Sequence, residues 1–547
     1  MAKNGMHEPH HMRVICIGAG ISGIAAAYKA QRQLVNIELV IYEKNHDVGG
    51  TWLENRYPGC ACDIPAHSYT FSWEGNPEWS RFYVEAPEIF DYLKKCAGKW
   101  GCMNFIKLRH RVIGATWDEQ ALKWTVKVQG PDGTEINDVC DVLISATGPL
   151  NKWQWPDIPG LDDFKGLRLH PARWDASVDL SGKRVAVIGA GSSALQIVPT
   201  IQPVVSKLVN FIRSPTWVTA EYGQAFARAG RDTRFTETEI NSFKSDKEEF
   251  LEYRRKLLDA STKAFDLYFK DTDMQRQAFE ANRAAMRKRL KGHKEICNKL
   301  IPDFEVGCRR VSPGHGYLEA LIEPNVTVVF DGIKLVNETG ILDNNNVQHD
   351  VDVIICATGF DVSHRPAFPV LGRGAQDLRD FWNQGPIHYL SVASPRFPNY
   401  FRANHSVVGG PNAPISNVSL IMGLELAVDY AFSCVRKMQT ENIGSLEVKR
   451  EAADDFLEQR DKIMQGMVWT GSCVSWYKNG SDNGAVTGPW CGSIWHYKET
   501  LESPRWEDFE IQYLEKNRFA YLGNGRTHRE LSGESMARTY LKDHGLY

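Results

Sequence analysis

Two glycine-rich turns are the residues whose spacing most clearly predicts chemistry. The first, Gly18-Ala19-Gly20-Ile21-Ser22-Gly23, follows the β-rich run "RVICI" and opens an alanine-rich helix. In a G-x-G-x-x-G turn the first glycine allows a tight bend, the second lets the backbone approach a pyrophosphate, and the third permits close helix packing. The helix then offers free N–H groups and the positive end of its dipole to the phosphates. We therefore predict that Gly18, Gly20, Ser22 and Gly23 bind a dinucleotide.

An acidic residue, Glu43, ends the next predicted strand, "IELVIYEK". A carboxylate at this position accepts hydrogen bonds from a ribose diol and repels a 2′-phosphate. The first site is therefore expected to take FAD or NAD, with a solvated charge at a strand end as the alternative interpretation.

The second turn, Gly189-Ala190-Gly191-Ser192-Ser193-Ala194, repeats this design in "KRVAVIGAGSSALQIVPTI". The strand after it, "LVNFIRSP", ends in Arg213-Ser214, where the first unit has an acid. An arginine and a hydroxyl there would pair with a 2′-phosphate, which favours NADP over NAD. The predicted contacts are Gly189, Gly191, Ser192, Ser193, Gln196, Arg213 and Ser214, and a surface cation is the alternative for Arg213.

One FAD-type and one NADP-type site on one chain indicate a flavoprotein reductase or oxygenase. A disulfide reductase needs C-x-x-C or C-x4-C beside the flavin, and the first unit carries only the C-x-C of Cys60 and Cys62. The 12 cysteines are scattered through a chain whose first residues have no apolar run of signal-peptide length. They are therefore expected to be free thiols in a reducing compartment, the cytoplasm.

Composition and pattern predict an α/β fold of two Rossmann-like units. The chain has 547 residues, 43% of them hydrophobic, and a net charge of −3 that gives no support for nucleic-acid or anionic-membrane binding. No run of ~18 apolar residues predicts a membrane span. Two buried-looking strands end in Ala-Thr-Gly, at "DVLISATG" and "DVIICATGF", one after each glycine turn.

A helical, charged segment interrupts the second unit. Residues 220–306 have helical spacing and few β-branched residues, and the region after 361 contains one good helix and aromatic-rich loops. We therefore expect residues 1–148 and 362–547 to form the FAD-binding domain. Residues 149–219 and 307–361 would form the NADP-binding domain, and residues 220–306 the insertion.

Two further stretches resemble one flavoprotein family specifically. "GGTWLENRYPGCACD" fits the flavin loop of the type I Baeyer–Villiger monooxygenases at Gly49-Gly50, Trp52, Tyr57-Pro58-Gly59 and Asp63. "FKGLRLHPARWD" fits the same family's fingerprint at Phe164, Gly166, His170, Trp174 and Asp175. The second stretch separates these enzymes from other flavin monooxygenases, and the resemblance covers most of the chain.

The resemblance implies a definite reaction. NADPH reduces FAD, O₂ gives a C4a-peroxyflavin, and this intermediate inserts one oxygen atom beside a ketone carbonyl to give an ester or lactone. NADP⁺ would stay bound and protect the peroxide. An enzyme that oxygenates nitrogen or sulfur is the alternative, and a flavoprotein that senses NADPH without turnover is a second one. Ketone and O₂ are the expected partners, and a monomer is the expected state.

The resemblance also assigns roles to residues. In "EVGCRRVSPGHGYLEAL", Arg310 matches the catalytic cation, and Arg309 matches a basic residue that contacts the 2′-phosphate. Asp63 would hold Arg310, a fixed charge that stabilises an oxyanion in a water-poor pocket. His170 is expected to set domain orientation and not to transfer protons. The resemblance places Gly50, Thr51, Trp52, Asp63 and Tyr69 at the flavin.

Trp476 resembles the family's loop tryptophan over the nicotinamide, with a structural aromatic as the alternative. Asn479-Gly480 and the stretch from Trp490 to Gly492 resemble fungal members of the family.

Overall fold

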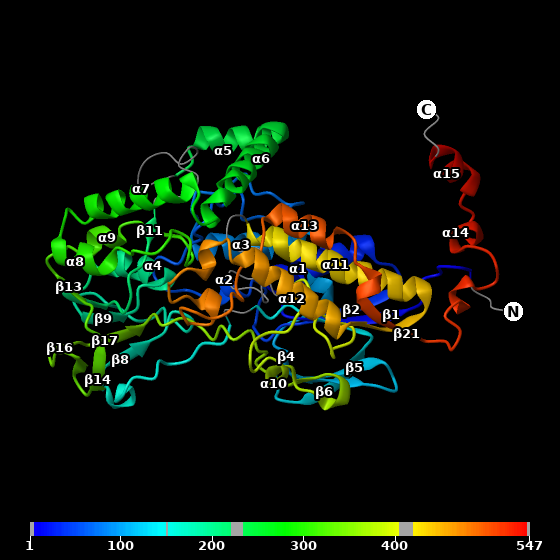
Figure 1. Cartoon of the computed structure of the whole chain (residues 1–547), viewed down its shortest axis with the longest axis horizontal. Helices are drawn as coiled ribbons and strands as arrows, with labels where there is room; N and C mark the ends of the chain where they lie inside the picture. Colours follow the sequence, from blue (N-terminus) through cyan, green and yellow to red (C-terminus); the bar gives the residue numbers. More distant parts are fainter. Residues whose placement is uncertain (1–4, 149–150, 220–233, 404–418, 544–547) are drawn as a thin grey trace.

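The computed structural model describes residues 5–148, 151–219, 234–403 and 419–543. The structure is built around two five-stranded parallel sheets, and each sheet lies toward one end of the long axis (Figure 1). In the first sheet the order is β19-β7-β1-β2-β3. Its strands are β1 (Met12–Ile17), β2 (Ile37–Tyr42), β3 (Ile106–Lys107), β7 (Val142–Ser145) and β19 (Tyr400–Arg402).

Both faces of the first sheet are covered, as expected for parallel strands. Val14 and Cys16 of β1 face one cluster, which includes residues of α1 (Ile21–Gln33) and α11 (Leu420–Glu441). Their neighbour Ile15 faces a second cluster, on the side of an antiparallel sheet. The strands of that sheet are β4 (Arg111–Asp118), β5 (Lys123–Gln129), β6 (Glu135–Cys140) and β18 (Val370–Leu371).

The second sheet repeats the arrangement in the order β13-β10-β9-β17-β8. Its strands are β8 (Leu167–Leu169), β9 (Arg184–Ile188), β10 (Lys207–Phe211), β13 (Val326–Val329) and β17 (Val353–Cys356). Helices α4 (Ser192–Ile201) and α9 (Tyr317–Ala320) lie on one face. Three short antiparallel strands cover the other: β14 (Ile333–Asn337), β15 (Gly340–Asp343) and β16 (Gln348–Asp350). The prediction of an α/β fold with two Rossmann-like units is confirmed.

Helices make up most of the described part of the predicted insertion, residues 234–306, and residues 220–233 lie outside the described residues. The helices are α5 (Glu237–Ser245), α6 (Lys247–Lys263), α7 (Asp273–Arg289) and α8 (Lys294–Leu300), the green helices of Figure 1. The chain reaches them from β11 (Val218–Thr219) and leaves them before β12 (Ser312–Pro313). These two strands pair in parallel, so the entrance and exit of the insertion lie side by side.

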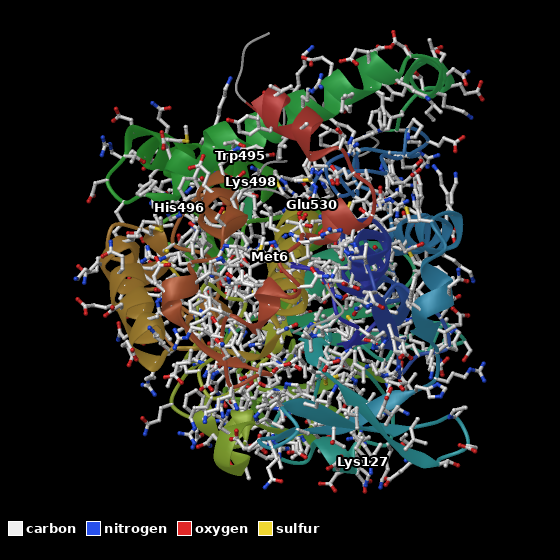
Figure 2. The ribbon with its side chains drawn as sticks, turned by 90° about the vertical axis from the view of Figure 1, so that its right-hand side faces the viewer. Met6, Lys127, Trp495, His496, Lys498 and Glu530 are labelled. Atoms are coloured by element: carbon white, nitrogen blue, oxygen red, sulfur yellow. A yellow bond between two sulfur atoms is a disulfide. The ribbon has the colours of Figure 1, made fainter. Side chains whose placement is uncertain are left out.

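The chain after residue 361 returns to the first sheet. β19 pairs with β7, and α11 then packs against α1. Beyond it, Met6 near the N-terminus lies beside the C-terminal segment, where it bridges Thr527 (Figure 2). The remaining elements are α2 (Thr51–Glu54), α3 (Ala86–Lys99), α10 (Leu378–Phe381), β20 (Ile443–Val448), α12 (Arg450–Met464), α13 (Ile494–Glu502), β21 (Phe509–Tyr513), α14 (His528–Leu531) and α15 (Met536–Asp543).

The prediction that all cysteines are free thiols was wrong for one pair. Cys308 and Cys473 form a disulfide, and the other ten cysteines are free and buried. The pair is 165 residues apart in the chain, so no local spacing reveals it. Cys60 and Cys62 remain thiols, and burial raises the pKa of each to about 12.

Among the described residues, no helix is long and apolar enough to cross a membrane.

Candidate active site

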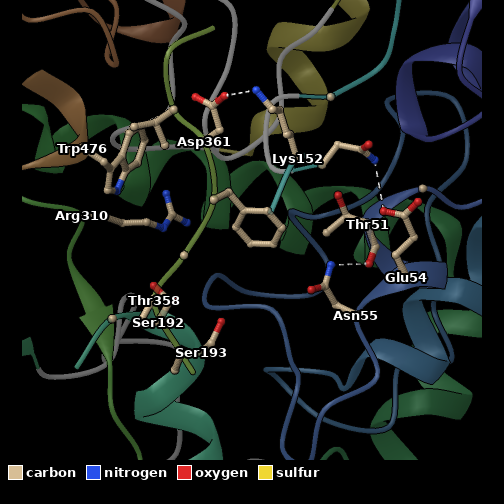
Figure 3. Close-up of a pocket in the computed structure, with 18 of the residues that line it drawn as sticks. Thr51, Glu54, Asn55, Lys152, Ser192, Ser193, Arg310, Thr358, Asp361 and Trp476 are labelled. Carbon is tan, nitrogen blue, oxygen red and sulfur yellow. Dashed lines mark hydrogen bonds and ion pairs between the residues drawn. The ribbon is translucent and has the colours of Figure 1, made fainter. Parts of the chain in front are cut away.

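A cavity of about 1180 Å³ lies between the two units and is lined by both glycine turns (Figure 3). On one side it meets Thr51, Glu54 and Asn55, and on the other Ser192, Ser193 and Arg310. Every predicted site residue lines this cavity except Gly23, which packs behind the first turn.

The first turn is built for close backbone approach. Gly18 has a φ of +104°, and a Cβ there would lie 2.6 Å from the carbonyl oxygen of Ala146, the alanine of the first Ala-Thr-Gly. A Cβ on Gly23 would meet the carbonyl of Gly18. The turn therefore tolerates only glycine at these two positions, and α1 points its N-terminus into the cavity. Ser22 is buried in its first turn.

Glu43 is a buried carboxylate with both oxygens engaged. One oxygen accepts the backbone N–H of Ala19 at 2.7 Å, and the other accepts that of Asn45 at 2.8 Å. Burial raises its pKa, while these two hydrogen bonds favour the charged form. Each carboxylate oxygen has a second lone pair. Glu43 therefore braces the glycine turn and can still accept a ribose hydroxyl, so it is not the solvated charge of the alternative interpretation.

The flavin-loop residues gather beside the first turn. A Cβ on Gly50 would lie 3.1 Å from the Cα of Gly20, so the two loops touch. Thr51 starts the short helix α2, and Trp52 follows it. The Trp52 indole Nε1 donates to the hydroxyl of Tyr69 at 3.1 Å, and both side chains are buried.

Asp63 and Arg310 form a two-pronged ion pair, although they are far apart in the sequence. The Arg310 Nε and Nη2 atoms donate to the two carboxylate oxygens of Asp63 at 2.8 and 2.7 Å. Their side chains are only 15% and 18% exposed. The paired geometry fixes the plane of the guanidinium against the cavity. A lysine could not replace it, since only arginine presents two parallel donors.

The second turn repeats the steric contact of the first. Gly189 has a φ of +124°, and a Cβ there would lie 2.5 Å from the carbonyl oxygen of Ala357, the alanine of the second Ala-Thr-Gly. Gly191 is open, with nothing within 4 Å of a Cβ. The Ser192 hydroxyl lies 3.1 Å from that of Ser312, and Ser193 lines the cavity beside it.

Gln196 joins the second unit to the flavin loop. Its Nε2 donates to the carbonyl of Ala61 at 2.9 Å, and its Oε1 accepts the hydroxyl of Tyr57 at the same distance. The Gln196 side chain therefore lies beside the second turn and also connects the second unit to the first.

Two arginines with no acidic partner flank the second turn. Arg213 follows β10, and Arg309 donates from Nη1 to the carbonyl of Pro215 at 3.0 Å. Burial and the neighbouring Arg213 guanidinium lower the pKa of Arg309. Within the described ranges neither arginine pairs with a carboxylate, and the buried Nε of Arg309 has no partner. Two facing cations beside Ser214 fit a doubly charged phosphate.

Trp476 lies in a one-turn helix, η6 (Trp476–Lys478), on the same side of the cavity as Arg310 (Figure 3). Its ring is half-buried and packs on Tyr477, with ring centroids 4.2 Å apart. Trp476 thus lines the cavity on the side of Arg310, and its ring packs on a residue of its own loop.

His170 lies at the joint between the units, where two linkers run side by side: the one after the first Ala-Thr-Gly, which carries Trp153, and the one after the second, which carries Phe360. His170 is 1% exposed, and its ring stacks on Trp153 at 4.7 Å and meets Phe360 edge-on. Trp153 and Phe360 bridge each other, so one residue of each linker covers the histidine. Burial lowers its pKa to about 4, which leaves it neutral near pH 7. It lies in the joint, as expected, and does not line the cavity.

The other fingerprint residues shape the same joint. Phe164 is buried, and a Cβ on Gly166 would strike both its ring and the carbonyl of Asp352. Asp175 accepts from the backbone and hydroxyl of Ser177 at 2.9 and 2.6 Å. Trp174 packs against the large core.

Sequence reasoning missed several cavity residues. Lys152 and Asp361 form an ion pair of 2.7 Å between the two linkers (Figure 3). Arg402, at the end of β19, is buried with its Nε and Nη1 atoms unpartnered, and its guanidinium lies over the Trp382 ring. Only the fold brings these residues to the cavity, and the sequence around them carries no motif.

The site fits two dinucleotides. The first turn meets the flavin loop through two glycines, Gly20 and Gly50. The second lies beside Arg213 and Arg309, which pair with no carboxylate among the described residues. The first arrangement suits a diphosphate next to a flat ring system, and the second suits a 2′-phosphate.

Comparisons with known proteins agree with this geometry. A model of the NAD(P)-binding Rossmann-like domain matches residues 16–86. The FAD-binding monooxygenase tazF of the fungus Aspergillus terreus is 42% identical over 535 residues, which cover 96% of this chain and 94% of that protein. A Baeyer-Villiger monooxygenase of Pseudomonas aeruginosa is 34% identical over 492 residues, 89% of each chain.

A solved structure matches as well. Cyclohexanone monooxygenase from Rhodococcus sp. Phi1, bound to NADP⁺, aligns with a TM-score of 0.78 at 25% identity. The alignment covers 92% of this chain and 100% of that one. Taken with the paired turns and the ion pair between them, these likenesses show that the chain belongs to the type I Baeyer–Villiger monooxygenases.

Proposed function

We propose that the protein is an NADPH- and FAD-dependent Baeyer–Villiger monooxygenase that converts a ketone to an ester or lactone. The balanced reaction consumes one ketone, one O₂, one NADPH and one proton, and yields ester, NADP⁺ and water. The observation that carries the proposal is the Asp63–Arg310 pair in the wall between two nucleotide turns.

Each turn is assigned one nucleotide. FAD suits residues 1–148 with 362–547, because Glu43 and the joined loops at Gly20 and Gly50 lie there. NADPH suits residues 149–219 with 307–361, because Arg213 and Arg309 lie near each other and neither pairs with a carboxylate in the described part of the chain. Residues 220–306 form the insertion. Bound FAD, once reduced by NADPH, supplies the activated oxygen.

Arg310 and Asp63 carry the catalytic role. The guanidinium places a fixed positive charge where the ketone oxygen becomes negative as its carbonyl is attacked. Asp63 holds the plane of this group through two hydrogen bonds and offsets its cost of burial. Trp476 lines the cavity on the same side (Figure 3) and, as the resemblance implies, would cover the nicotinamide of bound NADPH. His170 stays neutral and fixes the joint between the units.

A panel of linear, aryl, cyclic and polycyclic ketones tests the proposal. NADPH consumption and product mass are measured together under ¹⁸O₂, and one labelled oxygen atom is expected per ester. An amine and a sulfide are added to the panel. Oxidation of these two without any ester from the ketones would favour the nitrogen- and sulfur-oxygenating alternative and overturn the proposal.

We also propose that the enzyme works in the cytoplasm, where NADPH is regenerated, and as a monomer. Light scattering coupled to size-exclusion chromatography measures the second point, and a mass near 61.8 kDa is the expected result.

A further inference from the structure

The disulfide joins the two segments of the cavity wall that carry Arg310 and Trp476. Cys308 directly precedes Arg309 and Arg310, and Cys473 lies three residues before Trp476. The two Cα atoms are 6.3 Å apart, and the residues are 0% and 1% exposed. The covalent bond therefore lies behind the cavity wall, next to the residues assigned to chemistry.

The segment that ends at Cys308 is firmly held on its other side. Val306 donates its N–H to Gln275 Oε1 at 3.1 Å and accepts Gln275 Nε2 at 2.9 Å, so α7 of the insertion grips its backbone. A Cβ on Gly471 would lie 2.6 Å from a Glu305 carboxylate oxygen and 3.4 Å from the Cys308 sulfur. The two segments thus pack together along their length, and the disulfide fixes their register.

The segment that begins at Cys473 is an ordered turn. The backbone N–H of Gly480 donates to the carbonyl of Ser475, and the N–H of Asn479 to that of Trp476. The ammonium of Lys478, which is 2% exposed, donates at 2.5 Å to the carbonyls of Gly471 and Asp482. A displacement at Cys473 is therefore carried through a stiff turn to the Trp476 ring.

We propose that the Cys308–Cys473 disulfide is a positioning element that holds the Trp476 turn against the Arg310 segment and so couples NADPH oxidation to oxygen insertion. The inference rests on the proposed function. With the bond broken, Trp476 and Arg310 remain in the fold but lose their fixed separation. Oxygen is then released as hydrogen peroxide, from one NADPH, one proton and one O₂, in place of ester formation.

The bond also makes the coupling sensitive to thiols. A dithiol reduces it to two thiols and is itself oxidised to a cyclic disulfide, with no net change in protons. The oxidised form makes more ester per NADPH than the reduced form.

Peptide mapping of the intact holoenzyme tests the bond itself. Iodoacetamide added to the denatured, unreduced protein is expected to label the ten free cysteines and leave Cys308 and Cys473 in one linked peptide pair. After reduction with a phosphine, all 12 cysteines should be labelled. Labelling of all 12 without reductant would overturn the inference.

The ratio of ester to hydrogen peroxide tests the role, with a ketone that the oxidised wild type converts. Four samples are compared: oxidised wild type, wild type reduced with phosphine and desalted, Cys308→Ala/Cys473→Ala, and Cys297→Ala. Cys297 is a free, buried cysteine of α8 and serves as the matched control. The ratio is expected to fall about threefold or more in the second and third samples and to stay unchanged in the control. Reoxidation of the reduced wild type with oxidised glutathione, which is reduced to two glutathione thiols, should restore it.

Further measurements separate this role from a merely structural one. FAD content is expected to stay within about twofold in all samples, since the first glycine turn, to which FAD is assigned, packs against Ala146 and contacts neither cysteine. A crosslink that only stabilises the fold would lower the melting temperature and leave the ester-to-peroxide ratio unchanged, which would overturn the inference. If oxidised wild type forms no ester from any ketone, the proposed function fails instead.

Discussion

The two nucleotide-binding units share the same close backbone contact at the glycine turn, and they differ in the charge of the residue that ends the second strand. In each unit the first glycine of the turn lies against the alanine carbonyl of its own Ala-Thr-Gly strand, at Ala146 in one and Ala357 in the other. The second strand ends in the buried, hydrogen-bonded Glu43 in the first unit, and in the second unit in the exposed Arg213, which pairs with no carboxylate among the described residues. We propose that the backbone of each unit makes a phosphate site, and that one side chain per unit selects the nucleotide.

Loss of Arg310 should have the largest effect on the rate of ester formation. Arg310 belongs to neither glycine turn and lies in the cavity that both turns line, where the reaction is proposed to take place. Arg310→Ala is expected to lower the rate of ester formation by about 10²–10³-fold, through loss of the charge that faces the ketone oxygen. FAD content and NADPH affinity should change little. Arg310→Lys should recover only part of the rate, since lysine cannot pair with both oxygens of Asp63.

Rates from product mass and FAD content from absorbance check this prediction. Arg184→Ala is the matched control, because Arg184 is an exposed arginine at the start of β9 and pairs with Asp352 away from the cavity. Ester formation by Arg310→Ala at the wild-type rate would remove the catalytic role.

Replacing the first glycine of each turn with alanine tests the close contact that the two units share. Gly18→Ala and Gly189→Ala each combine a positive φ with a backbone clash, and each is expected to weaken its own nucleotide about a hundredfold. Gly18→Ala should lose FAD. Gly189→Ala should keep FAD and lose NADPH. Fluorescence titration of each cofactor measures both effects.

Gly191→Ala sharpens this test. Its Cβ would meet nothing within 4 Å in the protein, so the melting temperature should stay unchanged while NADPH binding weakens. Loss of both cofactors from either Gly18→Ala or Gly189→Ala would mean that the two units do not bind independently.

The difference in charge predicts a smaller and selective effect. Arg213→Ala removes a charge-assisted contact of about 1.5 kcal/mol, which is roughly tenfold in the KM for NADPH. The KM for NADH should stay the same, because NADH has no 2′-phosphate. Arg309→Ala should raise the KM for NADPH as well. The double variant, compared with the two single variants, gives the energetic coupling between the two arginines. An equal change for both nucleotides would contradict the assignment.

Glu43→Gln should give the smallest effect. The substitution replaces one carboxylate oxygen, an acceptor, with an NH₂ group, which cannot accept a backbone N–H. One of the two hydrogen bonds, from Ala19 or from Asn45, is therefore lost. This costs about 1 kcal/mol, or roughly fivefold in FAD affinity. Equilibrium dialysis of FAD measures it, and NADPH affinity serves as the internal control. A loss of NADPH affinity of the same size would break the assignment of Glu43 to the first nucleotide alone.

Local patterns could be predicted from the sequence, and contacts between distant segments could not. Both glycine turns, the strand ends at Glu43 and Arg213, and the helical insertion have short-range signatures, so the two Rossmann-like units were predictable. Asp63 and Arg310 were paired through the resemblance, since 247 residues separate them.

The bond from Cys308 to Cys473 depends on how the insertion and the C-terminal segment pack, and no spacing encodes that. Gln196 was expected beside a nucleotide, and its tie to the flavin loop appears only when the two units are placed together. Arg402 sits in a strand with no motif around it, so its unpartnered nitrogens were equally invisible.

The pairing of β11 with β12 has a consequence for how such a chain can change. Because Val218 lies opposite Ser312, the polypeptide leaves and rejoins the second unit at nearly one point. Insertions of different length can be exchanged between these two strands without shifting the register of the five-stranded sheet of the second unit. A chimaera cut at these two strands exchanges Cys308, Arg309 and Arg310 together with the insertion, so a grafted segment has to retain these three residues.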